Sequence, residues 1–239
     1  MTREPLSRER ICEAAVAVAD AGGLSALSMR SVGRELGVEA MSLYHHVGGK
    51  EELLDDLVDW TFAQIELPRP TDGWRQGMAR RAESARRILT AHPWSLTLID
   101  SRSNPGPALL RHHDAVIGCL RRGGFTVALA ARAFSVIDAY VYGFALTERN
   151  LPFEADTGAG EYAERVMEAL GGYPHLLELV RHLTGGGDYS FAAEFDLGLE
   201  LILDGLERRL ERRLEPSAEQ SLEQSCEPSA EAGRDGSRR

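Results

Sequence analysis

The sequence predicts an all-α protein, in which a small N-terminal three-helix bundle precedes a larger helical domain. Apolar residues recur at the i, i+3, i+4 and i+7 spacing of helices along most of the 239 residues. The alternating Val, Ile and Thr pattern that is typical of strands is almost absent. Glycine and proline residues interrupt the helical pattern at intervals that suit helix ends.

Short helices are expected in the N-terminal part, each between a capping residue and a breaker. They are bounded by Ser7 and Gly22-Gly23, by Ser28 and Gly37, by Glu39 or Ala40 and about His46, and by Lys50 and Pro68. Longer helices are expected beyond Pro68 and Pro70, at residues 72–91, 94–101, 106–122, 126–149, 161–183 and 189–213. From Glu215 onward Ser, Glu, Ala, Gln and Pro dominate without an apolar face, so we expect the tail 215–239 to be disordered.

The composition is that of an ordinary globular protein, with 43% hydrophobic and 27% charged residues. It excludes collagen-like, wholly disordered and disulfide-scaffold proteins. The cysteines Cys12, Cys119 and Cys226 are too few and too scattered for a disulfide framework or a zinc site, which indicates a reducing, cytoplasmic setting. The first ten residues are charged and lack an apolar core, so we expect no signal peptide.

Residues 127–146 form the most apolar stretch, which has about the length of a membrane span. However, Arg132 and Asp138 lie within it, and charged side chains are costly in lipid. We therefore interpret the stretch as a buried helix of a soluble protein and expect no membrane partner.

Charge is distributed unevenly along a chain whose net charge is −10. Residues 1–50 carry six basic and six acidic groups, whereas residues 51–66 carry six acidic groups and no basic one. The N-terminal segment is thus the part least repelled by an anionic partner, and the acidic stretch would disfavour nonspecific binding. Lys50 is the only lysine. The arginine pairs, such as Arg80-Arg81 and Arg86-Arg87, are expected on solvated, ion-paired helix faces.

The segment from Ser28 to Lys50 has the length and punctuation of a helix-turn-helix, with the turn at Gly37-Val38. In such a motif the second helix enters the major groove of DNA. The side chains suit this role, because small and apolar groups can contact thymine methyls while hydroxyls, imidazoles and cations can reach phosphates and base edges. The candidate DNA-binding residues are Ser28, Arg30, Ala40, Met41, Ser42, Tyr44, His45, His46 and Lys50.

Two other interpretations of this segment were weighed. The helix pair could be a hairpin in a core, but Tyr44-His45-His46 places polar aromatic residues on a helix barely two turns long. The same three residues could hold a metal, but no carboxylate or cysteine stands at ligand spacing from them. We therefore favour a DNA-reading helix and expect neither a metal nor another cofactor.

The arrangement LSMRSVGRELGVEAMSLYHHVGGKEELLDDL resembles the DNA-binding domain of tetracycline-repressor-type (TetR-family) regulators. The resemblance rests on Leu43-Tyr44, His45-His46, Gly48-Gly49, Lys50 and Leu53-Leu54, and it spans about residues 7–66. It implies that bases are faced by Arg30, Ala40, Met41 and Tyr44, that the DNA backbone is held by Ser28, Ser42, His46 and Lys50, and that His45 does either.

The remainder resembles the C-terminal domain of the tetracycline repressor more weakly, through Trp74, Gly124-Phe125 and Gly143. This implies an effector-binding and dimerisation domain, with the helices near 126–149 and 189–213 pairing across a two-fold axis. Arg81, Val116 and Thr147 replace the repressor's ligand-binding asparagine, glutamine and glutamate. We therefore expect an effector other than a magnesium–tetracycline chelate. The expected division is 1–66 for DNA binding, 67–214 for effector binding and dimerisation, and 215–239 for the tail.

An effector pocket is expected among the helices between residues 60 and 147, mostly apolar with a few polar groups. Its candidate residues are Trp94, Leu98, His113, Val116, Phe134, Asp138 and Tyr142. Each aromatic could instead be plain core or dimer interface. The run His112-His113-Asp114 is not expected to be a catalytic or metal trio, because adjacent helical residues point about 100° apart.

These features predict a dimeric, ligand-responsive repressor that a small organic molecule releases from a palindromic DNA operator. An activator of the same fold, or a regulator controlled by a protein partner, remains an alternative. A helical ligand-binding protein or enzyme that does not touch DNA is the other class. GxSxG, HExxH, Walker and dinucleotide motifs are absent from the sequence, so we expect no enzyme.

Overall fold

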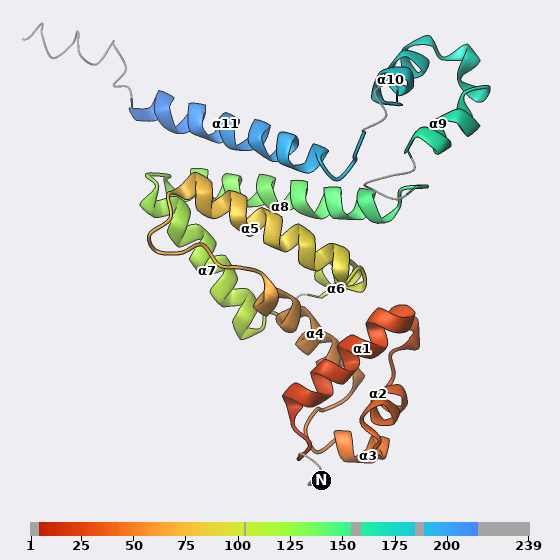
Figure 1. Cartoon of the computed structure of the whole chain (residues 1–239). Helices are drawn as coiled ribbons and strands as arrows, with labels where there is room; N and C mark the ends of the chain where they lie inside the picture. Colours follow the sequence, from red (N-terminus) through yellow and green to blue (C-terminus); the bar gives the residue numbers. More distant parts are fainter. Residues whose placement is uncertain (1–4, 103, 154–158, 185–188, 215–239) are drawn as a thin grey trace, which may run out of the picture.

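Helices account for the regular structure in this computed structural model, which describes residues 5–102, 104–153, 159–184 and 189–214. Figure 1 shows their arrangement, with α1–α3 at one end of the molecule and α5, α7, α8 and α11 layered at the other. The helices are α1 (Arg8–Ala26), α2 (Met29–Leu36), α3 (Ala40–Leu43), α4 (Lys50–Gln64), α5 (Trp74–Ala91), α6 (Trp94–Ser101), α7 (Pro107–Arg122), α8 (Val127–Arg149), α9 (Ala159–Val166), the 3-10 helix η1 (Ala169–Gly172), α10 (Pro174–Thr184) and α11 (Glu194–Leu214).

The N-terminal unit is shaped by local signals that the sequence displays. Ser28 and Ser31 form a capping box at the start of α2, in which each hydroxyl accepts a hydrogen bond from the other's backbone N–H. Gly37 then ends α2 with φ 64°, a left-handed conformation that suits glycine. Val32 and Leu43 are fully buried and hold α2 and α3 on α1. The predicted helix-turn-helix is therefore present.

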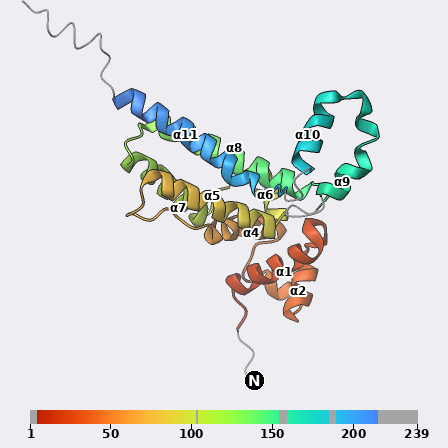
Figure 2. The same cartoon turned by 45° about the horizontal axis from the view of Figure 1, so that its top comes forward.

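The larger unit is built around α8, which packs against α5, α7 and α11. Its buried face includes Ala133, Ile137 and Val141 at helical spacing. Figure 2 shows α9 and α10 extending as an arm from one end of this layer. Helix α4 connects the two units, because it contacts α1 on one side and α5, α6 and α7 on the other.

Three predicted helix boundaries differ from the structure. The first helix continues past Gly22 to Ala26, although Gly23 inside it has the non-helical φ 68° and ψ −178°. The third helix is an α-helix only over Ala40–Leu43, and residues 44–46 continue it as a tighter turn. The single helix predicted at 161–183 is wrong. It divides into α9, η1 and α10, because Gly171-Gly172 and Pro174 interrupt it.

The expectation that the arginine pairs are solvated is wrong for Arg81, whose residue is only 1% exposed. Arg86 is also partly enclosed, since it forms an ion pair with Glu148 and lies over the rings of Phe144 and Phe195. The other members of these two pairs, Arg80 and Arg87, follow the prediction, because both lie within ion-pair distance of Glu66.

Helix α8 is long and apolar enough to cross a membrane by length and composition alone. Its Asp138 is buried against Arg81 of α5 within this fold, but only 28% of the apolar window is buried, so the expected buried helix is buried on one face alone. The tail 215–239, predicted to be disordered, lies outside the described residues.

Gly33 marks the closest approach of α2 to the turn, so replacing it should destabilise the N-terminal unit. A Cβ there would lie 2.9 Å from the Val38 carbonyl oxygen and 3.2 Å from the Ala40 nitrogen, both backbone atoms. We expect Gly33→Val to lower the free energy of unfolding by about 1–3 kcal/mol, measured by urea denaturation. Gly160→Ala is the control, because its Cβ would meet nothing within 4 Å. Equal midpoints for both variants would contradict this packing.

Candidate DNA-binding and effector sites

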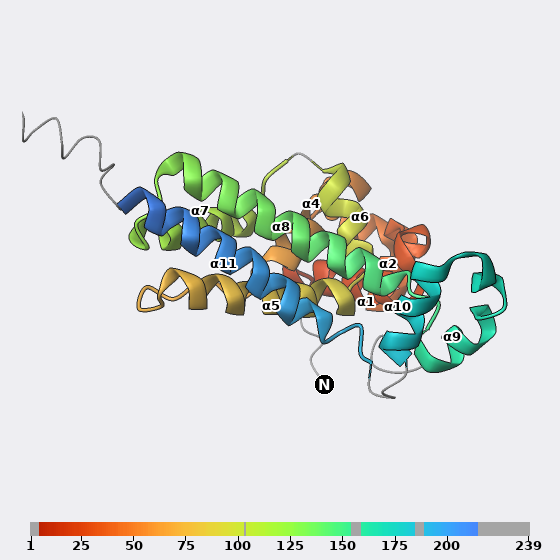
Figure 3. The ribbon, with the colours of Figure 1, turned by 90° about the horizontal axis from the view of Figure 1, so that it is seen from above.

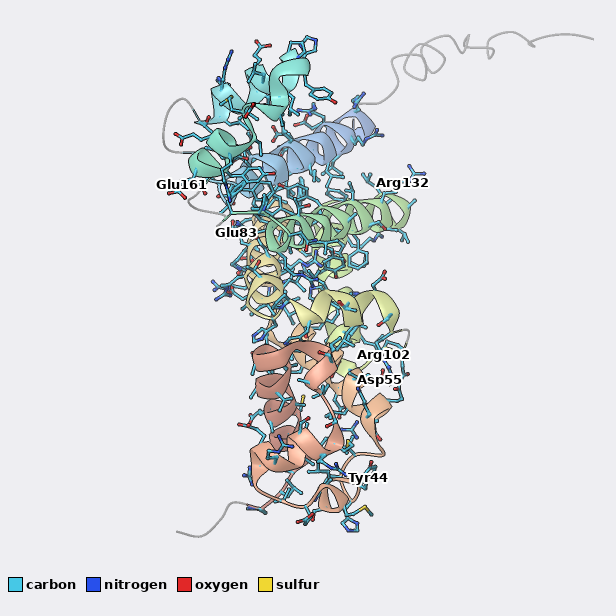
Figure 4. All side chains as sticks on the ribbon, turned by 90° about the vertical axis from the view of Figure 1, so that its right-hand side faces the viewer. Tyr44, Asp55, Glu83, Arg102, Arg132 and Glu161 are labelled. Atoms are coloured by element: carbon cyan, nitrogen blue, oxygen red, sulfur yellow. The ribbon has the colours of Figure 1, made fainter. Side chains whose placement is uncertain are left out.

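The first candidate site is the exposed surface of α3 and the turn after it. Met41 is 73% exposed and Tyr44 is 48% exposed, which is unusual for large apolar and aromatic side chains. Figure 4 shows Tyr44 at the end of the molecule farthest from α8 and α11. His45 and His46 are exposed beside it, whereas Leu43 and Val47 beneath are buried. The element thus anchors two apolar residues and presents polar aromatic ones to solvent.

A tight turn after α3 carries Tyr44, His45 and His46. The Tyr44 N–H donates to the Met41 carbonyl at 3.3 Å, and the His46 N–H donates to the Leu43 carbonyl at 2.9 Å. These i to i+3 bonds are those of a 3-10 turn, which is shorter-pitched than an α-helix. Tyr44, His45 and His46 are all exposed along this turn.

The remaining predicted DNA-binding residues surround this surface. Arg30 and Lys50 are exposed, and Ala40 and Ser42 are half-buried. Ser28 is exposed, but its hydroxyl already takes part in the α2 capping box. Lys50 opens α4, where free N–H groups and the helix dipole favour an anion.

The acidic residues of α4 and its C-terminal extension are all used within the fold. Four of them form ion pairs with two arginines: Arg8 binds Glu52 and Asp56, and Arg102 binds Glu51 and Asp55. The hydrogen bond from Arg102 holds the pKa of Asp55 below its ordinary value. Figure 4 shows Asp55 and Arg102 side by side.

The other two acidic groups are also engaged. Asp59 accepts hydrogen bonds from the N–H groups of Ala108 and Leu109 and so caps α7. Glu66 lies within ion-pair distance of Arg80 and Arg87. The acidic stretch therefore ties α4 to its neighbours, and its charge is largely balanced by arginines close to it.

The second candidate site is a buried polar cluster of Arg81 on α5, His112 on α7 and Asp138 on α8. Arg81 Nε donates to His112 Nε2 at 3.1 Å, and Arg81 Nη2 lies 2.5 Å from Asp138 Oδ1. The Tyr142 hydroxyl lies 3.5 Å from the other Asp138 oxygen. Arg81 and His112 are 1% and 0% exposed. Charged groups this deep are rarely found without a compensating partner.

Aromatic rings surround this cluster. The ring of Phe62 on α4 lies 5.1 Å from the His112 ring and 6.0 Å from the His113 ring. The ring of Phe134 lies 4.9 Å from the His113 ring and 5.9 Å from the Arg81 guanidinium carbon. Four helices thus contribute side chains to one polar centre with aromatic neighbours.

Three atoms of the cluster have no hydrogen-bond partner: Arg81 Nη1, His112 Nδ1 and Asp138 Oδ1. The last lies 2.5 Å from Arg81 Nη2, so its charge is paired by the guanidinium. Because His112 Nε2 accepts from Arg81, the neutral imidazole carries its proton on Nδ1. Burial and the charge of Arg81 lower the pKa of His112 to about 3, which keeps the ring neutral. Leaving each such group unpaired costs about 1–3 kcal/mol.

The structure brings together four of the predicted pocket residues: His113, Phe134, Asp138 and Tyr142. Leu98 and Val116 are buried core residues, at 3% and 0% exposure. His112, His113 and Asp114 were predicted to point in different directions, as adjacent helical residues do. This is confirmed, since His112 is fully buried whereas Asp114 is exposed.

Trp94 lies apart from these residues, at the junction of α1, α4 and α6. Its indole N–H donates to Asp20 Oδ1 at 2.6 Å, and His92 Nδ1 lies 2.8 Å from the same oxygen. The Trp60 ring packs on both, with centroids 4.9 Å from His92 and 6.3 Å from Trp94. Trp94 therefore joins the N-terminal unit to the larger one.

The predicted pocket residues do not include Phe62, Arg81 or His112, although the resemblance places Arg81 at a ligand-binding position. A signal was present for Arg81, because it falls on the apolar face of α5 with Met78, Ala82, Ala85 and Leu89. Phe62 likewise falls on the apolar face of α4 with Leu57 and Val58, whereas His112 gave no comparable signal. Their neighbourhood depends on how α4 and α7 pack against each other.

Comparisons with known protein families cover both units. Residues 11–57 match the family described as bacterial regulatory proteins, tetR family, and residues 67–210 match the tetracyclin repressor-like, C-terminal domain. The chain is 36% identical over 214 residues to the HTH-type transcriptional repressor DrrR1 of Streptomyces coeruleorubidus, covering 84% of this chain and 77% of that protein. It is 29% identical over 208 residues to the Escherichia coli tetracycline repressor protein class A from transposon 1721, covering 85% and 92%.

Solved structures show the same likeness. Apo ActR from Streptomyces coelicolor superposes with a TM-score of 0.73 at 30% identity, covering 88% of this chain and 99% of that one. ActR in complex with actinorhodin superposes with a TM-score of 0.70 at 31% identity, covering 87% and 99%.

The lowered pKa of His112 predicts that the fold loses stability in mild acid. A histidine in the unfolded chain titrates near 6.5, so between pH 6.5 and about 3 the unfolded chain binds a proton that the folded chain does not. Stability is therefore complete above pH 6.5 and falls as the pH drops below it, by about 2 kcal/mol at pH 5. Urea unfolding of the native chain and of His112→Gln at pH 7 and pH 5 measures this difference. Identical pH dependence in the two proteins would contradict it.

Proposed function

The chain belongs to the TetR family of transcriptional regulators and is a ligand-responsive, DNA-binding repressor, and we propose that it acts in the cytoplasm as a homodimer on a palindromic operator. Residues 1–66 bind DNA, residues 67–214 bind the effector and form the dimer, and a small organic molecule releases the operator. The observation that carries this proposal is the exposed Met41 and Tyr44 over a buried helix-turn-helix core.

The proposed contacts with DNA follow from the exposed surface of α3. Met41 and Ala40 contact thymine methyls, and Tyr44 and Arg30 reach base edges. Ser42, His46 and Lys50 hold phosphates, His45 does either, and Ser28 contributes only what its capping box leaves available. Arg8 and Arg102 neutralise much of the acidic charge of α4, which lowers the repulsion between this helix and the DNA.

The proposed dimer uses the outer faces of α8 and α11, which lie side by side in Figure 3. Both helices expose large apolar side chains in the single chain. Leu197 and Leu201, one turn apart on α11, are 56% and 64% exposed. On α8, Val136 and Leu146 are 43% and 46% exposed. A self-complementary apolar face of this kind suits a two-fold dimer, and two-fold symmetry in the protein requires a palindrome in the operator.

The two sites are joined by α4 in this proposal. Phe62 near its C-terminus contacts the rings of His112 and His113, and Lys50 at its N-terminus faces the DNA. Twelve residues of helix place these ends about 18 Å apart. An effector that displaces Phe62 therefore tilts or shifts the helix that carries Lys50. Asp20 and Trp94 provide a second connection, between α6 and α1.

Tyr44→Ala should abolish specific operator binding and leave the fold intact, since Tyr44 is 48% exposed. Selection from random DNA with the native chain should yield a palindrome, whose affinity falls steeply with salt. On that sequence we expect Tyr44→Ala to bind at least about 100-fold more weakly, by loss of base contacts. Tyr173→Ala, another exposed tyrosine, is the control. An unchanged footprint with Tyr44→Ala would contradict the assignment of the reading element.

Leu197→Glu combined with Leu201→Glu should give a monomer, because four glutamates would meet across the two-fold axis in place of apolar contacts. Sedimentation or size-exclusion chromatography at micromolar concentration measures the change, and operator affinity should fall with it. Leu110→Glu is the matched control, since Leu110 is 55% exposed on α7. A double variant that remains dimeric would place the interface elsewhere.

A further inference from the structure

Three arginines gather where the N-terminal end of α8 meets the C-terminal end of α11. They border a surface hollow of about 350 Å³, the arginine surface, which is lined by Thr126, Ala128, Leu129, Arg132, Arg209 and Arg212. We propose that the acidic segment 215–231 of the same chain docks on the arginine surface and shields it from the phosphates of DNA. This docking requires neither an operator nor an effector.

The charge of the arginine surface is not balanced within the fold. Among the described residues, no carboxylate oxygen lies within 4.0 Å of its three guanidinium groups. The nearest acids that precede Arg209 on α11 are used elsewhere, because Asp204 and Glu207 both pair with Arg75 of α5. Three like charges around one hollow repel each other, so an anionic partner stabilises the arrangement.

The helix dipole accounts for only part of this surface. Arg209 and Arg212 lie near the C-terminal end of α11, where a cation is favourable. Arg132 lies near the N-terminal end of α8, which favours an anion instead. The two ends meet because the helices run antiparallel: the Phe195 ring stacks on Tyr140, whereas Arg209 shares the hollow with Arg132. The end of α8 and the arginines therefore attract the same kind of partner.

The segment that follows α11 carries the complementary charge. Residues 215–231 contain five acidic residues and no lysine or arginine. The acidic residues recur at every fourth position, as Glu215, Glu219, Glu223, Glu227 and Glu231. Carboxylates repeated along a chain in this way can pair with several guanidinium groups at once.

The connection between this segment and the arginine surface is short. Glu215 follows Arg212 by three positions, and an extended chain spans about 3.3–3.6 Å per residue. The tether gives the segment an effective concentration of about millimolar, which favours it over the same segment of another copy. Each exposed ion pair contributes little alone, so the docking depends on several pairs and weakens with salt.

Without this occupant the arginine surface would offer DNA a second place to bind. Contacts between basic side chains and phosphates supply most of the nonspecific affinity of a protein for DNA. Figure 4 shows Arg132 in the layer of α8, at the other end of the molecule from Tyr44. DNA held at Arg132 would lie away from the reading element. Carboxylates of the chain itself at this surface therefore direct DNA to α3.

A double-mutant cycle on the full chain tests the proposal, with a duplex of random sequence as the probe. One change replaces all five glutamates of the segment by glutamine, which keeps its length. The other combines Arg132→Gln, Arg209→Gln and Arg212→Gln. At about 50 mM salt, we expect the arginine change to weaken DNA binding less than about twofold in the native chain. In the chain with the neutral segment it should weaken binding by at least about tenfold, because the surface is then open to DNA.

The matched control combines Arg111→Gln, Arg165→Gln and Arg181→Gln, since these arginines are also exposed and do not line the hollow. We expect the control to weaken binding equally in both chains. If the arginine change also has equal effects in both chains, the segment repels DNA only through its total charge, and the proposal is overturned.

Disulfide formation locates the segment. Cys226 belongs to residues 215–231, whereas Cys12 and Cys119 are buried. Ala128→Cys places a thiol in the hollow. We expect this thiol to join Cys226 within one chain at least about tenfold faster with the native segment than with the neutral one. Ala63→Cys, at an exposed position of α4, corrects for any change in thiol reactivity between the two segments.

Either of two outcomes of this experiment would overturn the docking. A rate that is the same with both segments would mean that the tether alone brings the thiols together. A disulfide between two chains, seen as a covalent dimer on a non-reducing gel, would make the occupant the segment of a second copy. Neither readout uses an operator or an effector, so a failure here leaves the proposed function standing.

Discussion

The larger unit is organised by a charge pair buried between α5 and α8. Arg81 and Asp138 lie 2.5 Å apart with almost no solvent access, and His112 of α7 accepts from the same guanidinium. A buried ion pair of this kind seldom stabilises a fold more than apolar packing of equal volume would. It does fix the relative positions of the three helices, because a shift of any one leaves a charge without its partner. The same arrangement keeps His112 neutral and leaves Arg81 Nη1 and His112 Nδ1 without a hydrogen-bond partner.

Helix α4 connects the surroundings of this pair to the N-terminal unit at the other end of the molecule. Its Phe62 packs on His112, and its acidic groups bind Arg8 of the N-terminal unit and Arg102 at the end of α6. Each of these ion pairs is only partly buried and adds little stability alone. Together they make α4 a shared element of both units, and in the proposed function a displacement at the cluster would reach the helix-turn-helix through this helix.

Helix α8 has one face buried in the interior and another that exposes apolar side chains. Ile137, Asp138 and Val141 face the interior, whereas Val136 and Leu146 face outward beside the exposed leucines of α11. In the proposed dimer both faces of this helix are covered, which accounts for an apolar content high enough to resemble a membrane span. Effector and partner subunit would then contact opposite sides of one helix, and a change on either side reaches the other through a single layer of packing.

The sequence by itself determined the N-terminal unit, because the interactions that form it are local. The Ser28 cap, the left-handed Gly37 and the exposed Tyr44 lie close together in the chain, so residue type and spacing were enough to predict the helix-turn-helix. The Gly171-Gly172 break was visible in the sequence too, but the apolar period on either side of it suggested one helix. Tertiary structure alone decided that Arg81 is buried and that Trp94 binds Asp20. Those contacts join residues 57 and 74 positions apart, and the energy of burying a charge depends on partners that no local pattern records.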